Sequence, residues 1–301
     1  MSNIDLIIEE RPRTVGNFLV GRLLPFRSKR AVGPFVFIDH MGPVAVSHMQ
    51  PVDIGPHPHI GLSTLTYLFE GSIMHRDSLG TAMEITPGAV NWMTAGSGIV
   101  HSERTPDRLR SPGKQPGSAQ THTMHGLQIW VALPKELEEM APSFHHVGAD
   151  ELPRWKTGGA EYKLIAGAHF GHRSPVPVHS KLYLLEIKCA EDHQVLLGDG
   201  LFGEVGLYIL AGQVETEGEA FGPRQILVAK DPAHCGFLMK GGTTVYLFGG
   251  EPFPEERFIY WNFVSTDQAK IEAAKVRWRN QEFMLPPDEH GPVPLPGEQF
   301  R

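Results

Sequence analysis

Short apolar runs closed by turn-forming residues recur along the whole chain, and they constrain the fold more than any other feature of the sequence. Each run is rich in β-branched or aromatic residues and is bounded by Gly, Pro, Asp or Ser, which is typical of β-strands. Evenly spaced short strands predict sandwiches or barrels, and 33 Gly and 25 Pro supply the many turns that such folds need. Six of these runs lie at residues 35–38, 62–69, 126–133, 182–187, 205–210 and 243–248.

A weak internal repeat indicates that the strands form two related groups. Tyr67 and Tyr208 each begin a strand-like run that ends in a Gly turn, and Ile85 and Ile226 are separated by the same 141 residues. A chain of 301 residues is also longer than one modest core usually organises. The repeat and the length together predict two domains of the same kind.

The predicted organisation is all-β, with two β-barrel domains and a helix near the C-terminus. The first domain is expected at residues 1–134 and the second at residues 156–284. Pro134, Pro142 and Pro153 mark a linker at residues 135–155, in which residues 135–140 are expected to form a short helix. The tail at residues 285–301 holds five prolines and is expected to be extended and only partly ordered.

The longer helix is predicted directly after the last strands, where it would close the second domain. Ser265 is the expected N-cap, and Gln268 three residues on completes a capping box. Ile271, Ala274 and Trp278 then recur at helical spacing and form one apolar stripe.

Charge and composition exclude several classes of protein. The formal net charge of -7 and the pI near 6.1 argue against direct nucleic-acid binding. No apolar run approaches the ~20 residues needed to span a bilayer, and the acidic N-terminus is unlike a signal peptide. Two cysteines, Cys189 and Cys235, cannot form a disulfide framework, so a reducing, cytoplasmic location is expected. Both thiols are expected to be buried and inert.

Two polar pairs with strand spacing carry the chemistry of the first domain. His57 and His59 are two residues apart, and so are His101 and Glu103. Because alternate residues of a strand project from one face, each pair can point into a barrel. Three imidazoles and one carboxylate would suit Fe, Mn, Ni, Cu or Zn, and not Ca or Mg. The spacing alone leaves a metal site and scattered polar residues as equal alternatives.

The second domain offers no equivalent set. Shifting His59 and Glu103 by the repeat distance of 141 residues leads to Gly200 and Thr244, which cannot replace them as ligands. The second domain is therefore expected to be free of metal and structural.

Two further histidines are candidates for positions behind the ligands. His40 follows an apolar strand, and His75 lies in a predicted hairpin beside Arg76 and Asp77. A role in hydrogen bonding elsewhere is the alternative for both. The sequence contains no Walker loop, no paired Cys-x-x-Cys and no nucleophile elbow. The remaining spaced histidines are expected to be surface or hydrogen-bonded residues, and they are His122, His125, His145, His146, His169 and His172.

At these residues the chain closely resembles the pirin family, which are metal-binding bicupins of the cupin superfamily. The resemblance covers most of the chain. Its most specific part includes Pro56-His-Pro-His-Ile-Gly61 and Asn91-Trp-Met-Thr-Ala-Gly-Ser-Gly-Ile-Val-His-Ser-Glu103. Further matching segments lie at residues 36–42, 66–71, 75–80, 87–88, 249–253 and 261–265.

The resemblance implies two cupin-type β-barrels with a C-terminal helix. It implies that His57, His59, His101 and Glu103 are the ligands of one divalent transition metal, with Fe(II) favoured over Mn, Ni, Cu or Zn. The chain departs from the family pattern at two places near the ligands: Ser63 stands where many members have Glu, and Ile60 replaces the usual Arg.

The resemblance also implies an activity, because several pirins are quercetin 2,3-dioxygenases. The expected substrates are a flavonol such as quercetin and dioxygen, with release of carbon monoxide, and Glu103 is the expected general base. A second interpretation is a non-enzymatic module that binds a transcription factor or a metabolic enzyme in a metal- or redox-dependent way. A third is dioxygenase chemistry on another small enol or catechol.

Overall fold

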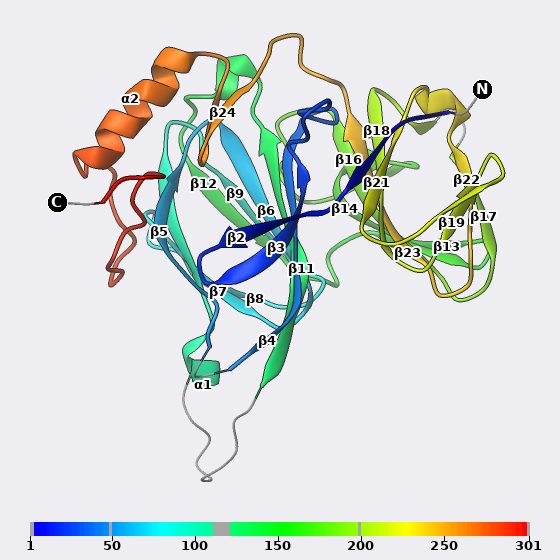
Figure 1. Cartoon of the computed structure of the whole chain (residues 1–301), viewed down its shortest axis with the longest axis horizontal. Coiled ribbons are helices and arrows are strands. Elements are labelled where there is room, and N and C mark those ends of the chain that lie inside the picture. The colour runs from blue at the N-terminus through cyan, green and yellow to red at the C-terminus, as the bar shows by residue number, and fades with distance from the viewer. Residues whose placement is uncertain (1–2, 48–49, 111–120, 198–199, 300–301) are drawn as a thin grey trace. The chain divides into compact units, whose positions relative to one another are not determined.

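The structure is a computed structural model that describes residues 3–47, 50–110, 121–197 and 200–299 (Figure 1). It divides into two compact units. The N-terminal barrel comprises Pro12–Val20, Asp39–His146 and Glu255–Arg301, and the C-terminal barrel comprises Met1–Arg11, Gly21–Ile38 and Val147–Pro254. Among the described residues, none of the helices has the length and apolar character that a membrane crossing requires.

The N-terminal barrel is made of two sheets. One has the strand order β12-β9-β6-β11-β4-β3-β2, and the other has the order β5-β10-β7-β8. The strands are β2 (Arg11–Val15), β3 (Phe18–Leu24), β4 (Phe35–Val46), β5 (Asp53–His59), β6 (Leu62–Glu70), β7 (Ile73–Asp77), β8 (Ala82–Ile85), β9 (Val90–Thr94), β10 (Ile99–Arg104), β11 (His122–Ala132) and β12 (Ser143–Val147). The unit also holds α1 (Asp107–Arg110), a 3₁₀ turn (Lys135–Leu137), the hairpin β24 (Phe258–Tyr260) and β25 (Phe263–Ser265), and α2 (Gln268–Arg279).

The C-terminal barrel repeats this arrangement of a larger and a smaller sheet. Its larger sheet has the order β1-β21-β18-β23-β16-β14-β13, with β15 beside β14, and its smaller sheet has the order β17-β22-β19-β20. The strands are β1 (Ile4–Glu9), β13 (Arg154–Thr157), β14 (Ala160–His169), β15 (His172–Arg173), β16 (Leu182–Cys189), β17 (His193–Leu196), β18 (Glu204–Ala211), β19 (Val214–Thr216), β20 (Glu219–Phe221), β21 (Gln225–Ala229), β22 (Gly236–Met239) and β23 (Thr244–Gly250). A second 3₁₀ turn lies at Pro232–His234.

All six strands expected from the apolar runs are present, and the two barrels confirm the repeat. Tyr67 and Tyr208, the residues that revealed it, lie in β6 and β18, which hold the same place in their sheets. Alternate apolar residues of each barrel point inward and form separate cores, as the strand period requires.

The units are interleaved in the sequence, whereas contiguous domains were expected. The N-terminal strand β1 pairs with β21 of the C-terminal barrel, and residues 255–301 belong to the N-terminal barrel. The expected linker holds a strand, β12, which lies beside β9 in the larger sheet of the N-terminal barrel. Apolar alternation shows that a segment is a strand but carries no information on which sheet it joins.

The prediction that the long helix closes the second domain is wrong. The stripe of Ile271, Ala274 and Trp278 is buried as expected, but it packs on Ile60 and Val100 of the N-terminal barrel. Figure 1 shows α2 and the tail after it beside β5. The amphipathic pattern identified the buried face of the helix, and any apolar surface could have covered it.

The expected N-cap is also wrong, by two residues. Asp267 caps α2, because its side chain accepts a hydrogen bond from the backbone N–H of Ala269 at 2.8 Å. The hydroxyl of Ser265 is engaged by other groups: it donates to Glu138 at 2.7 Å and accepts from the N–H of Asp267 at 3.0 Å.

The tail after α2 is more ordered than expected and lies along β5. The backbone N–H of Val293 donates to the carbonyl of Pro56 at 2.8 Å, and the indole of Trp278 donates to the carbonyl of Val293 at 3.0 Å. Glu289 accepts two hydrogen bonds from Arg104 in β10. The tail therefore covers the edge strand of the smaller sheet, which would otherwise present unpaired backbone groups.

Candidate metal centre

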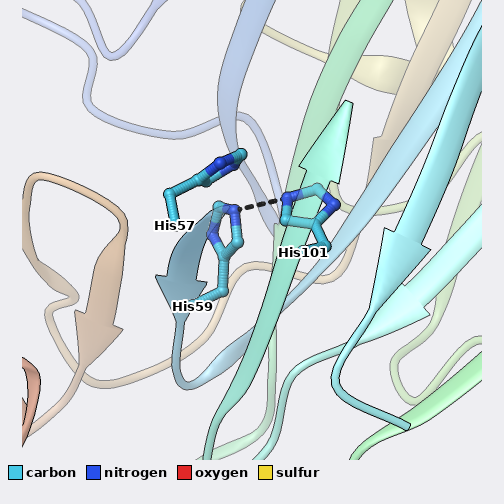
Figure 2. Close-up of side chains that lie close together, drawn as sticks. All are labelled: His57, His59 and His101. Carbon is cyan, nitrogen blue, oxygen red and sulfur yellow. Dashed lines mark hydrogen bonds between the residues drawn. The ribbon is translucent and has the colours of Figure 1, made fainter. Parts of the chain in front are cut away.

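Three histidines converge on one point inside the N-terminal barrel. His57 and His59 come from β5, and His101 lies directly opposite His57 on the neighbouring strand β10. The side chains therefore share one face of the smaller sheet. One nitrogen from each ring lies within 4.8 Å of the other two, and Figure 2 shows the three rings grouped between the two strands. The His-x-His spacing predicted this convergence.

The ring nitrogens that face the common point differ in their hydrogen bonds. Nδ1 of His57 lies 2.9 Å from the carbonyl of Gly55, so it donates there and Nε2 keeps its lone pair. Nε2 of His59 and Nε2 of His101 are 3.1 Å apart, and this contact is the dashed line in Figure 2. Without a metal one of these two nitrogens must donate to the other.

Burial keeps the imidazoles neutral. The exposed fractions of His57, His59 and His101 are 8%, 1% and 1%. Loss of hydration disfavours the charged form and lowers the pKa of His57 to about 4, against a smaller opposing effect of the Gly55 carbonyl. Desolvation, with repulsion between neighbouring imidazoles, holds the pKa of His59 and of His101 well below the usual value. Neutral imidazoles are the form that binds metals.

These residues fit a divalent transition metal. Imidazole nitrogens bind such ions at about 2.1 Å, so two of them in adjacent octahedral positions lie about 3.0 Å apart. The 3.1 Å between the two Nε2 atoms matches that spacing. Three buried, neutral nitrogen donors with few competing partners can hold a metal ion, and the donor set excludes Ca and Mg.

Glu103 lies beside the three histidines on the same face of β10 but is not part of their group. Its carboxylate is buried, and Oε1 accepts a hydrogen bond from the hydroxyl of Thr66 at 3.1 Å. The same hydroxyl lies 2.9 Å from the side-chain oxygen of Gln128. A hydroxyl has one proton, so if Thr66 donates to Glu103, the amide of Gln128 must be turned so that its NH2 group faces Thr66 and donates to it. Burial raises the pKa of Glu103, and the electrostatic effect of His75 and the Thr66 hydrogen bond oppose this only in part.

His75 and Asp77 stand directly behind His101. Both lie in β7, where Asp77 pairs with His101 and His75 with Glu103. Nδ1 of His75 is 3.3 Å from Nδ1 of His101, and Nε2 of His75 is 2.9 Å from Oδ2 of Asp77. The expectation that His75 lies near the site agrees with this arrangement. Asp77 was not among the predicted residues, although His75 and Asp77 form a third pair with strand spacing.

The structure places the other candidate, His40, against a different partner. Nε2 of His40 lies 2.7 Å from Nε2 of His125, whose ring packs edge-on against Phe69. Neither histidine belongs to the three-histidine group. His146 bonds to the side chain of Asn91 at 2.7 Å.

The two departures from the family pattern serve packing and hydrogen bonding. Ile60 follows His59 but lies in the apolar cluster beneath α2, in contact with residues such as Phe263 and Trp278. Ser63 is buried in β6 and exchanges a hydrogen bond with the hydroxyl of Thr94 at 3.0 Å.

The C-terminal barrel has different residues at the equivalent positions. In β22, Leu238 pairs with Glu215 as Arg104 pairs with Met74, which places Cys235 where the N-terminal barrel has His101. Leu197 lies opposite Cys235, where His57 would stand. Desolvation raises the pKa of Cys235 to about 11, so its thiol is protonated, and Cys189 is buried. That this barrel is free of metal stays a prediction.

Comparison with protein families identifies the chain. The family model of pirin matches residues 17–131, and the model of the pirin C-terminal cupin domain matches residues 184–284. The chain belongs to the pirin family. The predicted family membership and the two-barrel cupin fold are thereby confirmed.

Two relatives illustrate the range of pirins to which the chain is similar. A pirin-like protein of Caulobacter vibrioides is 48% identical over 297 residues, which cover 97% of this chain and 99% of the relative. A Pseudomonas aeruginosa protein named "Putative quercetin 2,3-dioxygenase" is 37% identical over 265 residues, which cover 87% of this chain and 79% of the relative.

Solved structures show the same fold. The crystal structure of quercetin 2,3-dioxygenase from Acinetobacter baumannii superposes with a TM-score of 0.85 and 33% identity, over 98% of this chain and 97% of that one. The pirin YhhW of Escherichia coli, solved in complex with nickel(II), superposes with a TM-score of 0.62 and 20% identity, over 82% of this chain and 99% of that one. At 20% identity the second likeness concerns the fold alone.

Proposed function

We propose that this pirin is a metal-dependent dioxygenase that cleaves flavonols such as quercetin and releases carbon monoxide. The observation that carries the proposal is the buried group of three neutral histidines with a carboxylate of raised pKa beside it on the same sheet face. The relatives named for quercetin 2,3-dioxygenase and the fold shared with the Acinetobacter baumannii enzyme support this choice of chemistry.

His57, His59 and His101 would hold the metal, with Glu103 as the fourth ligand and Fe(II) as the proposed ion. A bound metal would act as a Lewis acid toward the flavonol 3-hydroxyl and as an electron donor to dioxygen. With four protein ligands, such an ion would keep room for binding a hydroxyl group and dioxygen.

Glu103 is proposed to take the proton of the flavonol 3-hydroxyl. Glu103 would take this proton with its carboxylate swung away from the metal; in the metal-free protein burial raises its pKa, which favours proton uptake. Thr66 holds one oxygen of the carboxylate by its hydrogen bond and so orients the other. The surrounding barrel, including Trp130 edge-on to His59, keeps the histidine group dry.

The proposal is tested with metal-free protein reloaded anaerobically with Fe, Mn, Ni, Cu or Zn. On admission of oxygen we expect loss of the quercetin absorbance and release of one carbon monoxide per flavonol. Glu103→Gln, which keeps the shape but not the basicity, should lower kcat at least ~100-fold. Glu139→Gln is the matched control, because Glu139 is exposed and pairs with Lys270.

Two outcomes would contradict the proposal. Full metal occupancy without quercetin consumption for any metal would exclude the flavonol dioxygenase and leave a metal-dependent binding module or a dioxygenase of another small enol or catechol. Full turnover by Glu103→Gln would be compatible with the dioxygenase activity but would contradict the assignment of Glu103 as the general base.

A further inference from the structure

A continuous chain of polar groups runs from the backbone of one hairpin to the three-histidine group. It passes from Asp77 to His75 and from His75 to His101, over contacts of 2.9 and 3.3 Å. All three side chains are buried, with exposed fractions of 0%, 4% and 1%. Buried polar groups of this kind are costly unless each donor has an acceptor, so the direction of every hydrogen bond matters.

The carboxylate of Asp77 sets that direction. Oδ1 accepts from the backbone N–H groups of Leu79 at 2.9 Å and Thr81 at 3.0 Å, and Oδ2 faces Nε2 of His75. Burial alone would raise the pKa of Asp77, but the hydrogen bonds from His75 and Thr81 outweigh it and lower that pKa. An ionised carboxylate only accepts, so Nε2 of His75 must donate.

The same accounting continues through the two rings. A His75 ring with a single proton carries it on Nε2, because that atom must donate to Asp77, so its Nδ1 is bare and accepts from Nδ1 of His101. His101 then carries its proton on Nδ1 and has a lone pair on Nε2, the atom that faces His59 and the common point. His57 reaches the same state more simply, by donating Nδ1–H to the carbonyl of Gly55.

We propose that Asp77, acting through His75, is a positioning residue that fixes the tautomer of His101 so that Nε2 is available to the metal. This inference rests on the proposed metal site, because it assigns a role only to the groups behind one of its ligands. Stacking on the ring of Phe144, with ring centroids 4.5 Å apart, fixes the orientation of the His75 ring. Outer partners of this kind commonly fix the tautomer of a metal-binding histidine.

Replacement of Asp77 by Asn would keep the hydrogen bonds from residue 77 through His75 to His101 but reverse the direction in which each one donates. The oxygen of the introduced amide would stay with the N–H groups of Leu79 and Thr81, since only an oxygen can accept there. The amide nitrogen would then face His75 and donate to it. His75 would carry its proton on Nδ1 and donate to His101, whose proton would move to Nε2 and block the metal position.

The test measures the tautomer in metal-free protein labelled with ¹⁵N-histidine. Long-range ¹H–¹⁵N spectra show which ring nitrogen carries the proton, and a His101→Gln variant assigns the signals. We expect His101 protonated on Nδ1 in the wild type and on Nε2 in Asp77→Asn. Affinities for Ni²⁺ and Zn²⁺, measured by competition with a chelator, should fall about 10- to 100-fold in Asp77→Asn.

His75→Phe separates tautomer control from simple support of the fold. Phe keeps the stacking on Phe144 but removes the acceptor, so His101 should sample both tautomers and lose less metal affinity than in Asp77→Asn. Adding Asp77→Asn to His75→Phe should change affinity little further, because the relay is already absent. Asp231→Asn, which alters an exposed Asp–His pair in the C-terminal barrel, is the matched control and should leave both readouts unchanged.

The inference is overturned if His101 keeps its proton on Nδ1 in Asp77→Asn, or if His75→Phe lowers affinity more than Asp77→Asn does. If Asp77→Asn does not fold, the single His75→Phe variant still decides, since an unchanged His101 tautomer there contradicts the relay. Neither readout uses quercetin, so failure of the dioxygenase proposal would leave this result standing, and the reverse is also true.

Discussion

Two imidazoles of the candidate metal centre have their second nitrogen hydrogen-bonded by different kinds of partner. His57 uses a backbone carbonyl two residues back in its own strand, whereas His101 uses a side chain of the neighbouring strand. The alternate spacing of His57 and His59 was enough to predict that they share a face. The contribution of Asp77 was not readable, because it depends on the register between β7 and β10, which no local pattern specifies.

Burial of neutral histidines predicts that the metal-free protein loses stability in acid. The unfolded chain takes up protons near the ordinary histidine pKa of 6.5, whereas His57 in the folded state does so only near pH 4. The unfolded state therefore binds more protons between these values, and the free energy of unfolding falls as the pH falls from 6.5 to 4. Each such histidine contributes up to about 1.4 kcal/mol per pH unit.

Urea unfolding of the metal-free protein at about pH 7, 6 and 5 measures this effect. A variant with His57→Gln should show a shallower dependence than the wild type, because one of the late-titrating groups is gone. Gln194→Ala, at an exposed position in a strand of the C-terminal barrel, removes no titratable group; it is the comparison and should leave the slope unchanged. Equal stability at the highest and the lowest of these pH values would contradict the burial argument.

At the scale of elements, the end of β5 is held by the hairpin β24–β25. The N–H of Val264 donates to the carbonyl of Ile60 at 3.2 Å, and Gly61 turns the chain there with a φ of +69°. The apolar runs predicted β4, β6 and β11 of the N-terminal barrel, whereas β5 and β10, which carry the histidines, were inferred only from the spacing of their polar pairs. The runs missed the hairpin β24–β25, because a three-residue strand carries too short a pattern. The N-cap of α2 was misplaced because Ser265 and Asp267 are both good N-caps.

Gly61→Ala should destabilise the N-terminal barrel and weaken the metal site. A Cβ at residue 61 would lie 1.9 Å from the carbonyl oxygen of Val264, so the hairpin must move away from the strand that carries His59. Gly80→Ala is the matched control, because Gly80 also has a positive φ, +89°, but its Cβ would meet nothing within 4 Å.

Chemical denaturation and metal titration of the two variants test this prediction. Gly80→Ala should cost about 1 kcal/mol for backbone strain alone. Gly61→Ala should cost several kcal/mol, because the displaced backbone adds to the same strain. Equal losses in both variants would mean that the hairpin does not support the strand.

At the scale of the whole molecule, the repeat predicted two barrels but not which segments of the chain belong to each barrel. Tyr67 and Tyr208 mark equivalent strands, and that equivalence survives in the sheet order. The exchange of terminal segments leaves no mark in the repeat, because β1 and α2 have the same local patterns whichever barrel they join.

Truncation after Pro254 should therefore destabilise the N-terminal barrel, although the deleted residues are C-terminal in the sequence. The shortened chain keeps every segment of the C-terminal barrel but removes the hairpin, α2 and the tail from the N-terminal barrel. Ile60 and Val100, neighbours of His59 and His101, lose their apolar cover. We expect one calorimetric transition to persist, the other to disappear, and metal binding to fall at least tenfold.

Adding residues 255–301 as a separate peptide is the control, and it should restore part of the metal affinity. Unchanged metal affinity and two intact transitions in the truncated chain would show that α2 is dispensable.

The position of α2 has a consequence for synthesis on the ribosome. The strands that carry His57 and His101 leave the exit tunnel early, whereas the helix that covers their outer side is encoded much later, after the whole C-terminal barrel. At about 5–20 residues per second this delay is on the order of 10 to 40 s. During that time the nascent chain exposes the apolar surface that α2 later covers, on the outer side of the unfinished metal site, and chaperones bind surfaces of this kind.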